Sequence, residues 1–384
     1  MKYAVLGICI LVLTACGGGG SGSLEQSAFE AVASQTMPDA TLGERYMQRS
    51  RGHLETLTPD QAMRITESLE HLMQSTSTHV FGSVAQSWRQ GVSPVESVDA
   101  SFDGNRYALT LNREDGTRTT LDSEEHTAEL GTTWNANTNL VTRRPAIDGV
   151  IHAIDDNQIT VSGMAVEWSS SDFTDYLSGG YWMHVDLTPP SMADGLYGAE
   201  IGAFIDGTDY ENRTRMPVTG TAVYEGIATG AYTVTYGSDL LLGGVRDVTG
   251  AVGTGDYGGN LTLTANFASG TVSGWIADVV VNGFVLTPEG EYLDANRTPG
   301  HKIHLGADRI AANGQIVGST VQLFNSNLEI IETSGTWASR FSTVDNAQSL
   351  PRAIAGTHAG RFETAGGTQA IFVGFHHAAS EKFE

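Results

Sequence analysis

The stretch Leu261-Thr262-Leu263-Thr264-Ala265-Asn266-Phe267 decides the fold class. Apolar and polar residues alternate along it with a period of two, which is the pattern of a β-strand with one buried and one solvent-facing side. The turn residues Ala268-Ser269-Gly270 follow, and residues 272–281 supply a second strand rich in apolar side chains. The pattern therefore predicts an antiparallel hairpin at the centre of a β-rich region.

Segments of strand length lie on both sides of this hairpin, separated by Gly, Pro and Asp clusters. They are residues 106–112, 117–121, 158–168, 180–187, 200–205, 221–236, 315–324, 335–341, 353–362 and 369–376. Asp115-Gly116 is a hairpin turn signal between the first two segments. From Met216 onward the series predicts an antiparallel sandwich or an up-and-down barrel, and the 46 glycines fit barrel bends and closely packed strands.

Residues 24–92 carry most of the helical signal. Thr58 is a suitable N-cap and Pro59 fits the first helical position. Apolar residues then recur at helical spacing from Ala62 to Met73. We therefore expect a short helical segment ahead of the β region.

The N-terminus has the features of an export signal. Lys2 precedes a short apolar run, residues 4–13, which is too short for a permanent membrane-spanning helix. Leu13-Thr14-Ala15-Cys16 resembles the lipobox of bacterial lipoproteins, which implies cleavage before Cys16 and acylation of Cys16. The alternative is an ordinary secretory signal with a chance cysteine. Residues 17–23 form a Gly/Ser tether, and Gly17 favours the outer membrane by resemblance to lipoprotein sorting.

Composition excludes some partners and sites. The chain has 21 Lys and Arg against 44 Asp and Glu, a net charge of −23, without a basic cluster. Nucleic acid is therefore not an expected partner, because phosphate binding needs clustered Lys and Arg. The two cysteines, Cys9 and Cys16, both lie in the leader region, so we expect no disulfide and no thiolate metal site in the folded body.

Several short Gly-rich segments resemble the β-barrel domain of transferrin-binding protein B and its relatives. Those relatives include factor H-binding protein and the lipoproteins that acquire haem and haemoglobin. The segments are residues 220–226, 230–232, 255–259, 270–274 and 354–362, with the final strand 370–375 and the preceding region 176–182 and 202–204. The resemblance covers about residues 145–378 and is clearer over residues 216–378.

The resemblance implies a mainly β protein with a C-terminal, eight-stranded, antiparallel soluble β-barrel behind a β-rich handle. The expected domains are a signal peptide (1–15), the lipidated Cys16 with its tether (16–23), a helical segment (24–92), a handle (93–215) and the barrel (216–384). The last strand departs from the family, because it ends in Gly374-Phe375-His376-His377 where relatives often carry a basic dipeptide. The chain has room for one lobe, so transferrin binding is not carried over.

Catalytic motifs are absent from the sequence, and we expect no enzyme activity, cofactor or metal. His301 and His304 have i, i+3 spacing, and His376 and His377 are adjacent. Either pair could bind haem or a metal, and the alternative is exposed histidine on loops or strand ends. Adjacent strand residues point to opposite faces, so His376 and His377 should not ligate together.

Three other groups of residues are weaker candidates for a site. Asp206, Asp209 and Glu211 could offer oxygen ligands to Ca²⁺, but their spacing does not match an EF-hand and an acidic turn is the more ordinary interpretation. Trp88, Tyr181, Trp182 and Trp337 could anchor a protein partner, although core positions are the more ordinary interpretation. Residues 288–298 and 344–351 are expected loops long enough to carry recognition.

These observations favour a lipid-anchored binding module over an enzyme. The expected partners are a protein or small-solute ligand, by resemblance one that carries iron or haem or a host factor, and the membrane through the anchor. The resemblance also implies cell-surface export by an outer-membrane lipoprotein translocator. The alternative is a non-catalytic periplasmic lipoprotein that docks onto another envelope component.

Overall fold

The computed structural model describes residues 69–70, 72, 78–80, 83–88, 93–102, 107–122, 145–147, 154–155, 158–168, 176–186, 198–207, 215–238, 241–242, 246–287, 292–294, 301–318, 320–324 and 330–380. These residues are mainly β, which confirms the predicted class. Leu69, Glu70 and Leu72 are helical, and the rest of the expected helix lies outside the described residues.

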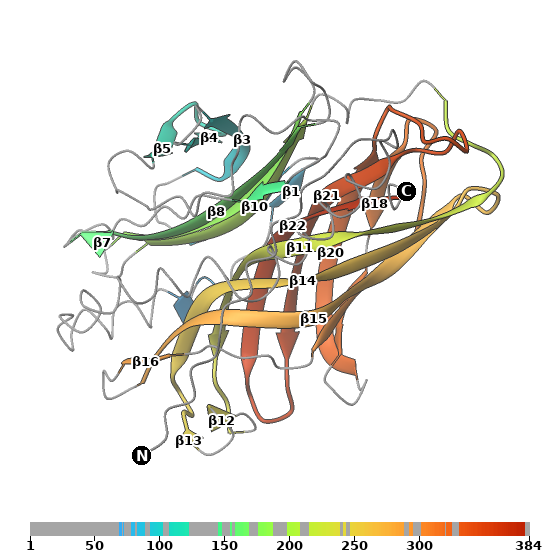
Figure 1. Ribbon diagram of the computed structural model, residues 1–384. Helices are drawn as coiled ribbons and strands as arrows, with labels where there is room; N and C mark the ends of the chain where they lie inside the picture. Colours follow the sequence, from blue (N-terminus) through green and yellow to red (C-terminus); the bar gives the residue numbers. More distant parts are fainter. Residues whose placement is uncertain are drawn as a thin grey trace, which may run out of the picture.

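The largest element is a ten-stranded antiparallel sheet, here called the curled sheet. Its strands are β11 (Thr221–Thr235), β14 (Val252–Asn266), β15 (Thr271–Leu286), β16 (Tyr292–Asp294), β17 (Lys302–Arg309), β18 (Gln315–Gly318), β19 (Val321–Phe324), β20 (Ile330–Phe341), β21 (Ala353–Glu363) and β22 (Gln369–Ala379). Their order is β14-β11-β22-β21-β20-β19-β17-β15-β16, β18 pairs with β20, and β14 also pairs with β15. The sheet curls strongly from β21 and β22 round to β14 and β15 (Figure 1).

Two further sheets precede the curled sheet in the chain. The seven-stranded sheet has the order β1-β2-β10-β9-β8-β6, with β7 paired to β8. Its strands are β1 (Thr78–Val80), β2 (Ser83–Trp88), β6 (Pro145–Ile147), β7 (Ile154–Asp155), β8 (Gln158–Trp168), β9 (Tyr176–Asp186) and β10 (Gly198–Gly207). A three-stranded sheet holds β3 (Val95–Phe102), β4 (Tyr107–Arg113) and β5 (Arg118–Asp122), and β12 (Leu241–Leu242) pairs with β13 (Arg246–Asp247).

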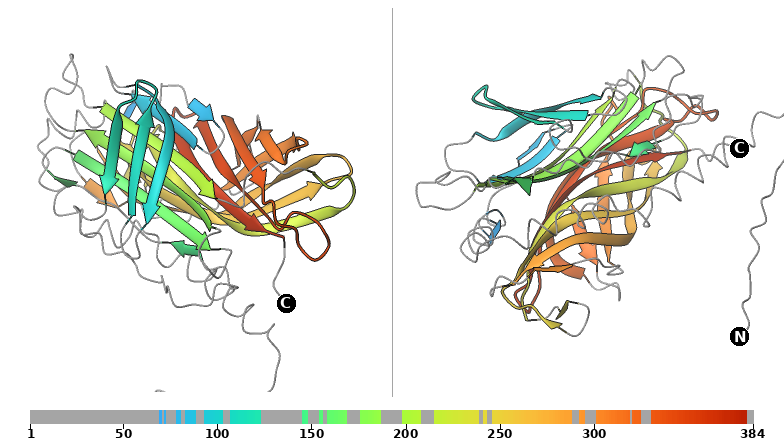
Figure 2. Two further views of the ribbon diagram at one scale, coloured as in Figure 1. Left: turned by 90° about the horizontal axis from the view of Figure 1, so that it is seen from above. Right: turned by 60° about the vertical axis from the view of Figure 1, so that its left-hand side comes forward.

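The three large sheets lie in layers, with the seven-stranded sheet between the other two (Figure 2). It packs on the convex face of the curled sheet. Ile205 packs against Ala353, Ala355 and Ala379 there, and the ring of Phe375 lies over Gly179. Because β22 is also buried on its concave side, it is covered on both faces.

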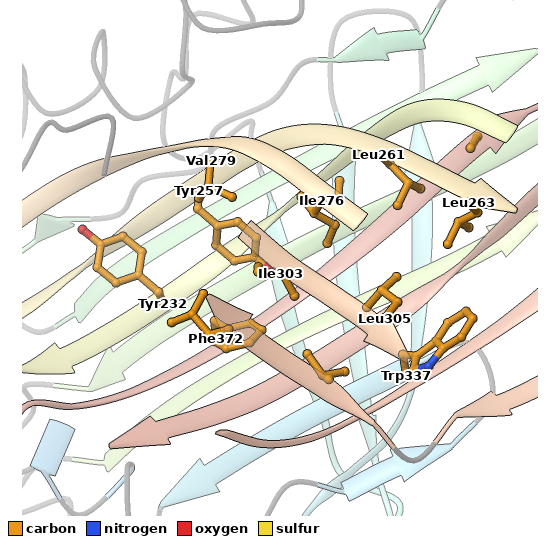
Figure 3. Packing of buried hydrophobic residues seen from close by; sticks show 14 of the residues in the cluster. Tyr232, Tyr257, Leu261, Leu263, Ile276, Val279, Ile303, Leu305, Trp337 and Phe372 are labelled. Atoms are coloured by element: carbon orange, nitrogen blue, oxygen red, sulfur yellow. The ribbon is translucent and has the colours of Figure 1, made fainter. Parts of the chain in front are cut away.

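Alternation places the core of the curled sheet on its concave side. Leu261, Leu263 and Ala265 point inward while Thr262 and Thr264 remain exposed, as the sequence predicts. Side chains from β11, β14, β15, β17, β19, β20, β21 and β22 join in one buried cluster. Figure 3 shows its centre, where aromatic rings pack among aliphatic side chains. The concave side is therefore filled by the protein's own side chains.

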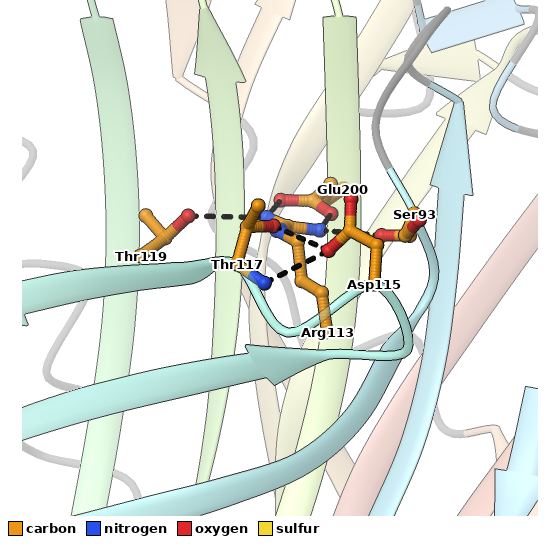
Figure 4. Close-up of polar contacts among 6 residues, drawn as sticks. All are labelled: Ser93, Arg113, Asp115, Thr117, Thr119 and Glu200. Carbon is orange, nitrogen blue, oxygen red and sulfur yellow. Dashed lines mark hydrogen bonds and ion pairs between the residues drawn. The ribbon is translucent and has the colours of Figure 1, made fainter.

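A buried ion pair joins the three-stranded sheet to the seven-stranded sheet. The Arg113 guanidinium on β4 donates to both carboxylate oxygens of Glu200 on β10, at 2.6 and 2.9 Å, and both side chains are almost fully buried. It also donates to the Ser93 carbonyl and the Thr119 hydroxyl (Figure 4). The charges are thus both paired and hydrogen-bonded, which the burial of a charge requires.

The structure differs from the sequence predictions in two places. Residues 78–80 and 83–88 fall within the expected helical segment but form β1 and β2, and β2 pairs with the edge of β10. That run is too short for a stable helix by itself, and an available sheet edge decides its conformation. The expected strand 315–324 is instead two strands, β18 and β19. Gly318 is the last residue of the first, and its missing Cβ leaves room for the Trp337 indole.

Candidate functional site

An exposed aromatic group lies on the convex face of the curled sheet, away from the seven-stranded sheet. Inward positions on β15, β17 and β19 are taken by Ile276, Ile303 and Leu323, so alternation turns Trp275 and His304 outward. The two rings are 4.5 Å apart between centroids, and the Phe324 ring is 5.1 Å from Trp275. We call Trp275, His304, Gln322 and Phe324 the Trp275 surface.

Strand register joins the Trp275 surface to a longer row of side chains. Trp275 is the cross-strand partner of both Thr262 and His304, and His304 is the partner of Gln322. His304 Nδ1 lies 3.3 Å from Gln322 Oε1, which orients the imidazole. Trp275 is 37% exposed and is among the few large apolar side chains that the described residues leave at the surface. Such a flat row of aromatic, imidazole, amide and hydroxyl groups suits recognition rather than catalysis.

A chain of hydrogen bonds crosses the buried core on the other side of the sheet. The Tyr257 hydroxyl is 2.6 Å from His358 Nε2, and His358 Nδ1 is 3.2 Å from His376 Nδ1. His376 Nε2 is 2.6 Å from the Ser339 hydroxyl. His358, His376 and Ser339 are fully buried and Tyr257 is nearly so. These groups come from β14, β21, β22 and β20, so the chain links four strands of the curled sheet.

The hydroxyls at the two ends allow this chain to run in either direction. Burial raises the pKa of Tyr257 well above its ordinary value of 10.0, so its hydroxyl keeps its proton. A protonated hydroxyl can donate to His358 Nε2 or accept from it, and the Ser339 hydroxyl can do the same at His376 Nε2. In both directions one N–H lies between the two Nδ1 atoms and each imidazole carries one proton.

The four candidate histidines lie in different environments. His301 is half-buried, and this burial lowers its pKa below the ordinary 6.5. His304 belongs to the Trp275 surface. His376 is fully buried, so the expectation of an exposed histidine is wrong for it, while His377 on the opposite face is only half-buried. Among the residues that the structure describes, no three His, Cys, Asp or Glu side chains come together as metal ligands.

Most of the candidate aromatic anchors are core residues. Tyr181, Trp182 and Trp337 are each at most 1% exposed, and of Trp88 only the backbone is described. Sequence reasoning missed Trp275 as an exposed residue. The alternation of the strand could have revealed it. Trp275 lies between Gly274 and Ile276, which face inward, so its own side chain faces outward.

Of the candidate loops and acids, only residues 344–351 are described in full. Residues 344–351 form a tight structure in which Asn346 Oδ1 accepts from the backbone of Gln348 and Leu350, and Asn346 Nδ2 donates to Ser380. Of residues 288–298 only β16 is described, and of Asp206 only the backbone. Asp209, Glu211 and Cys16 lie outside the described residues.

Comparison with known proteins adds no assignment. No family model matches this chain, and no curated protein matches it. Within the described residues, no helix combines the length and apolar character needed to cross a membrane.

Proposed function

We propose that this chain is a lipid-anchored binding protein of the bacterial outer membrane, displayed on the cell surface and not an enzyme. Acylated Cys16 holds it to the membrane through the tether of residues 17–23. The observation that carries the binding role is the Trp275 surface, an aromatic group on a rigid sheet in a position that alternation leaves to solvent. The ligand is a protein or a solute, in line with the resemblance to iron- and haem-acquisition lipoproteins.

We also propose that the curled sheet is a closed barrel of eight strands. Support comes from the pairings, which run β14-β11-β22-β21-β20-β19-β17-β15 and return to β14 through the β14–β15 pair. Closure removes exposed edges, which benefits a protein on a surface. Because side chains fill the concave side, the ligand contacts the outer wall rather than the interior.

Protease treatment of intact cells tests the location. With an epitope tag at the C-terminus, external protease is expected to remove the tag while periplasmic markers survive. The Cys16→Ala variant is the matched control, and it is expected to leave the membrane fraction because the acyl chains are lost. A tag that is protected until the cells are permeabilised contradicts surface display and favours the periplasmic docking role.

Replacing Trp275 by alanine is expected to weaken ligand capture by roughly 30-fold or more, because truncating a central aromatic contact costs about 2 kcal/mol or more. The measurement is capture from growth medium or host fluid by the immobilised protein, followed by titration of the captured component. Phe324→Ala is expected to act in the same direction. Val223→Thr is the control, since Val223 is 48% exposed but lies two strands away on β11.

Equal capture by the Trp275→Ala variant and the wild type contradicts the placement of the site. Unfolding curves must accompany the titration. Trp275 lies on the outer wall and outside the buried cluster, so its removal is expected to change stability far less than it changes binding.

A further inference from the structure

We infer that the Trp275 surface binds an extended neutral polysaccharide, with a sugar ring stacked on the indole and sugar hydroxyls bonded to the side chains beside it. The inference rests on the proposed binding role of this surface and names the class of its ligand. The features that carry it are the length of the outward row, the hydrogen-bonding groups along that row, its lack of charge and the small apolar area around it.

The outward row crosses five neighbouring strands, β11, β14, β15, β17 and β19. From one cross-strand partner to the next, it consists of Glu225, Thr262, Trp275, His304 and Gln322. Because neighbouring strands lie 4.7–4.9 Å apart, the row is roughly 19 Å long. That length accommodates several linked sugar rings, so a chain matches the row better than a single sugar does.

The indole of Trp275 is a platform for a sugar ring. One face of a pyranose presents C–H groups that carry a small positive charge, and the face of an aromatic ring is negative. Trp275 is 37% exposed, so its ring is accessible to a ligand. The contacts with His304 at 4.5 Å and Phe324 at 5.1 Å between ring centroids hold the indole in place. A platform that is already ordered limits the entropy that binding costs.

Hydrogen-bonding groups lie next to this platform. Within the part of the chain that the structure describes, neither the Thr262 hydroxyl nor the Trp275 Nε1–H has a hydrogen-bond partner in the protein. Gln322 Oε1 can only accept, so His304 Nδ1 donates to it, and the Gln322 amide N–H groups remain for a ligand. Sugar hydroxyls both donate and accept, so they can replace the water at these side chains.

The charge of the row favours a neutral ligand. From Thr262 to Gln322 the row contains no carboxylate, ammonium or guanidinium group. The charged residues Glu225, at the β11 end, and Lys302, the cross-strand partner of Phe324, stand at its margins. The whole chain has a net charge of −23 and therefore repels anionic polymers.

The small apolar area favours a polysaccharide over a protein partner. A stable protein interface buries about 800 Å² on each partner, with an apolar centre. Among the described residues, the large apolar side chains that are exposed are Val218, Val223 and Trp275. Val223 lies on β11, two strands away from Trp275. An isolated aromatic ring among hydroxyl and amide groups fits a sugar, whose own surface is polar around one C–H face.

Affinity electrophoresis of the wild-type protein tests the ligand class. Each native gel contains one neutral polysaccharide, namely hydroxyethylcellulose, galactomannan, arabinoxylan or dextran. Carboxymethylcellulose is the matched anionic probe, because it shares its backbone with hydroxyethylcellulose. We expect at least one neutral polysaccharide to retard the protein and carboxymethylcellulose to leave its migration unchanged. If no neutral polysaccharide retards the protein, or if carboxymethylcellulose retards it as strongly as the neutral ones, the inference is wrong.

Variants then place the polysaccharide on the row. Trp275→Ala is expected to weaken binding by roughly 30-fold, whereas Trp275→Phe keeps an aromatic platform and should retain most of the affinity. Thr262→Val removes one hydroxyl and is expected to cost roughly three- to ten-fold. Thr221→Val is the matched control, because Thr221 is an exposed threonine on β11 that pairs with Asn266 outside the row. Wild-type affinity in Trp275→Ala would overturn the inference.

Chemical treatment of the component captured from growth medium or host fluid separates this inference from the proposed function. Periodate cleaves the vicinal diols of sugars, and a protease digests proteins. Capture that is lost after periodate treatment and survives protease supports the polysaccharide. Capture that requires Trp275, survives periodate and is lost after protease treatment keeps the binding role but refutes the polysaccharide. Capture that Trp275→Ala leaves unchanged contradicts the proposed function itself.

Discussion

Replacing Arg113 by alanine is expected to lower the free energy of unfolding by about 3–5 kcal/mol, because it removes the guanidinium that pairs with the buried Glu200 carboxylate. The guanidinium donates to both oxygens of Glu200, at 2.6 and 2.9 Å, and Glu200 is only 1% exposed. The Ser93 carbonyl and the Thr119 hydroxyl lose a donor as well. Chemical denaturation at neutral pH measures the change.

A double replacement distinguishes the cost of breaking the ion pair from the stability that the intact pair contributes. Arg113→Met with Glu200→Leu removes both charges and keeps apolar volume, and such exchanges are often neutral or stabilising. We therefore expect the double variant to recover most of the stability that Arg113→Ala loses. If Arg113→Ala costs less than about 1 kcal/mol, the pair is reached by water and the packing of β4 on β10 described above is wrong.

The second large effect is expected at Trp337, which fills the centre of the curled sheet. Trp337→Ala should destabilise the protein by about 3–5 kcal/mol through lost burial and a cavity. The indole lies against Gly318, its cross-strand partner on β18, so closely that a Cβ at Gly318 would collide with its Nε1. Gly318→Ala is accordingly expected to cost about 1–3 kcal/mol by overpacking.

A double-mutant cycle tests whether these two positions act as one unit. In the Trp337→Ala background, Gly318→Ala should lose its penalty, because the ring that it collides with is gone. Gly258→Ala serves as the matched control on β14. A Cβ there would meet only the Ala228 carbonyl, at 3.9 Å, so the change should be nearly neutral. Additive effects of Gly318→Ala and Trp337→Ala would contradict the proposed contact.

The sequence predicts the strands of the C-terminal region well, since alternation such as that of residues 261–267 reports directly which face is buried. It does not reveal the contacts that unite distant strands. His376 was expected at the surface because a single histidine near a strand end gives no sign of His358 and Ser339, which lie 18 and 37 residues away in the chain. The Arg113–Glu200 pair joins positions 87 residues apart, and a local pattern contains no information on such a distance.

The high glycine content shows a further limit of composition. It predicts barrel bends and closely packed strands, and the structure shows close packing at several of these glycines. Several glycines sit opposite an aromatic residue on the neighbouring strand: Gly202 opposite Trp182, Gly318 opposite Trp337 and Gly360 opposite Phe372. At each of them a Cβ would collide with the ring. These glycines therefore leave room on the sheet for the large aromatic rings of the neighbouring strands.

The strand β22 is covered on both faces, by the core of the curled sheet and by the seven-stranded sheet. It therefore belongs to two hydrophobic cores, and neither can open without exposing one side of this strand. Units that share a central strand should behave as one cooperative unit in native-state amide exchange, with β22 exchanging only through global unfolding. Truncation near residue 215 would remove the seven-stranded sheet and would expose the outer face of β22, including Phe375. The smallest independently folding piece of this protein is therefore expected to contain β9 and β10 together with the curled sheet.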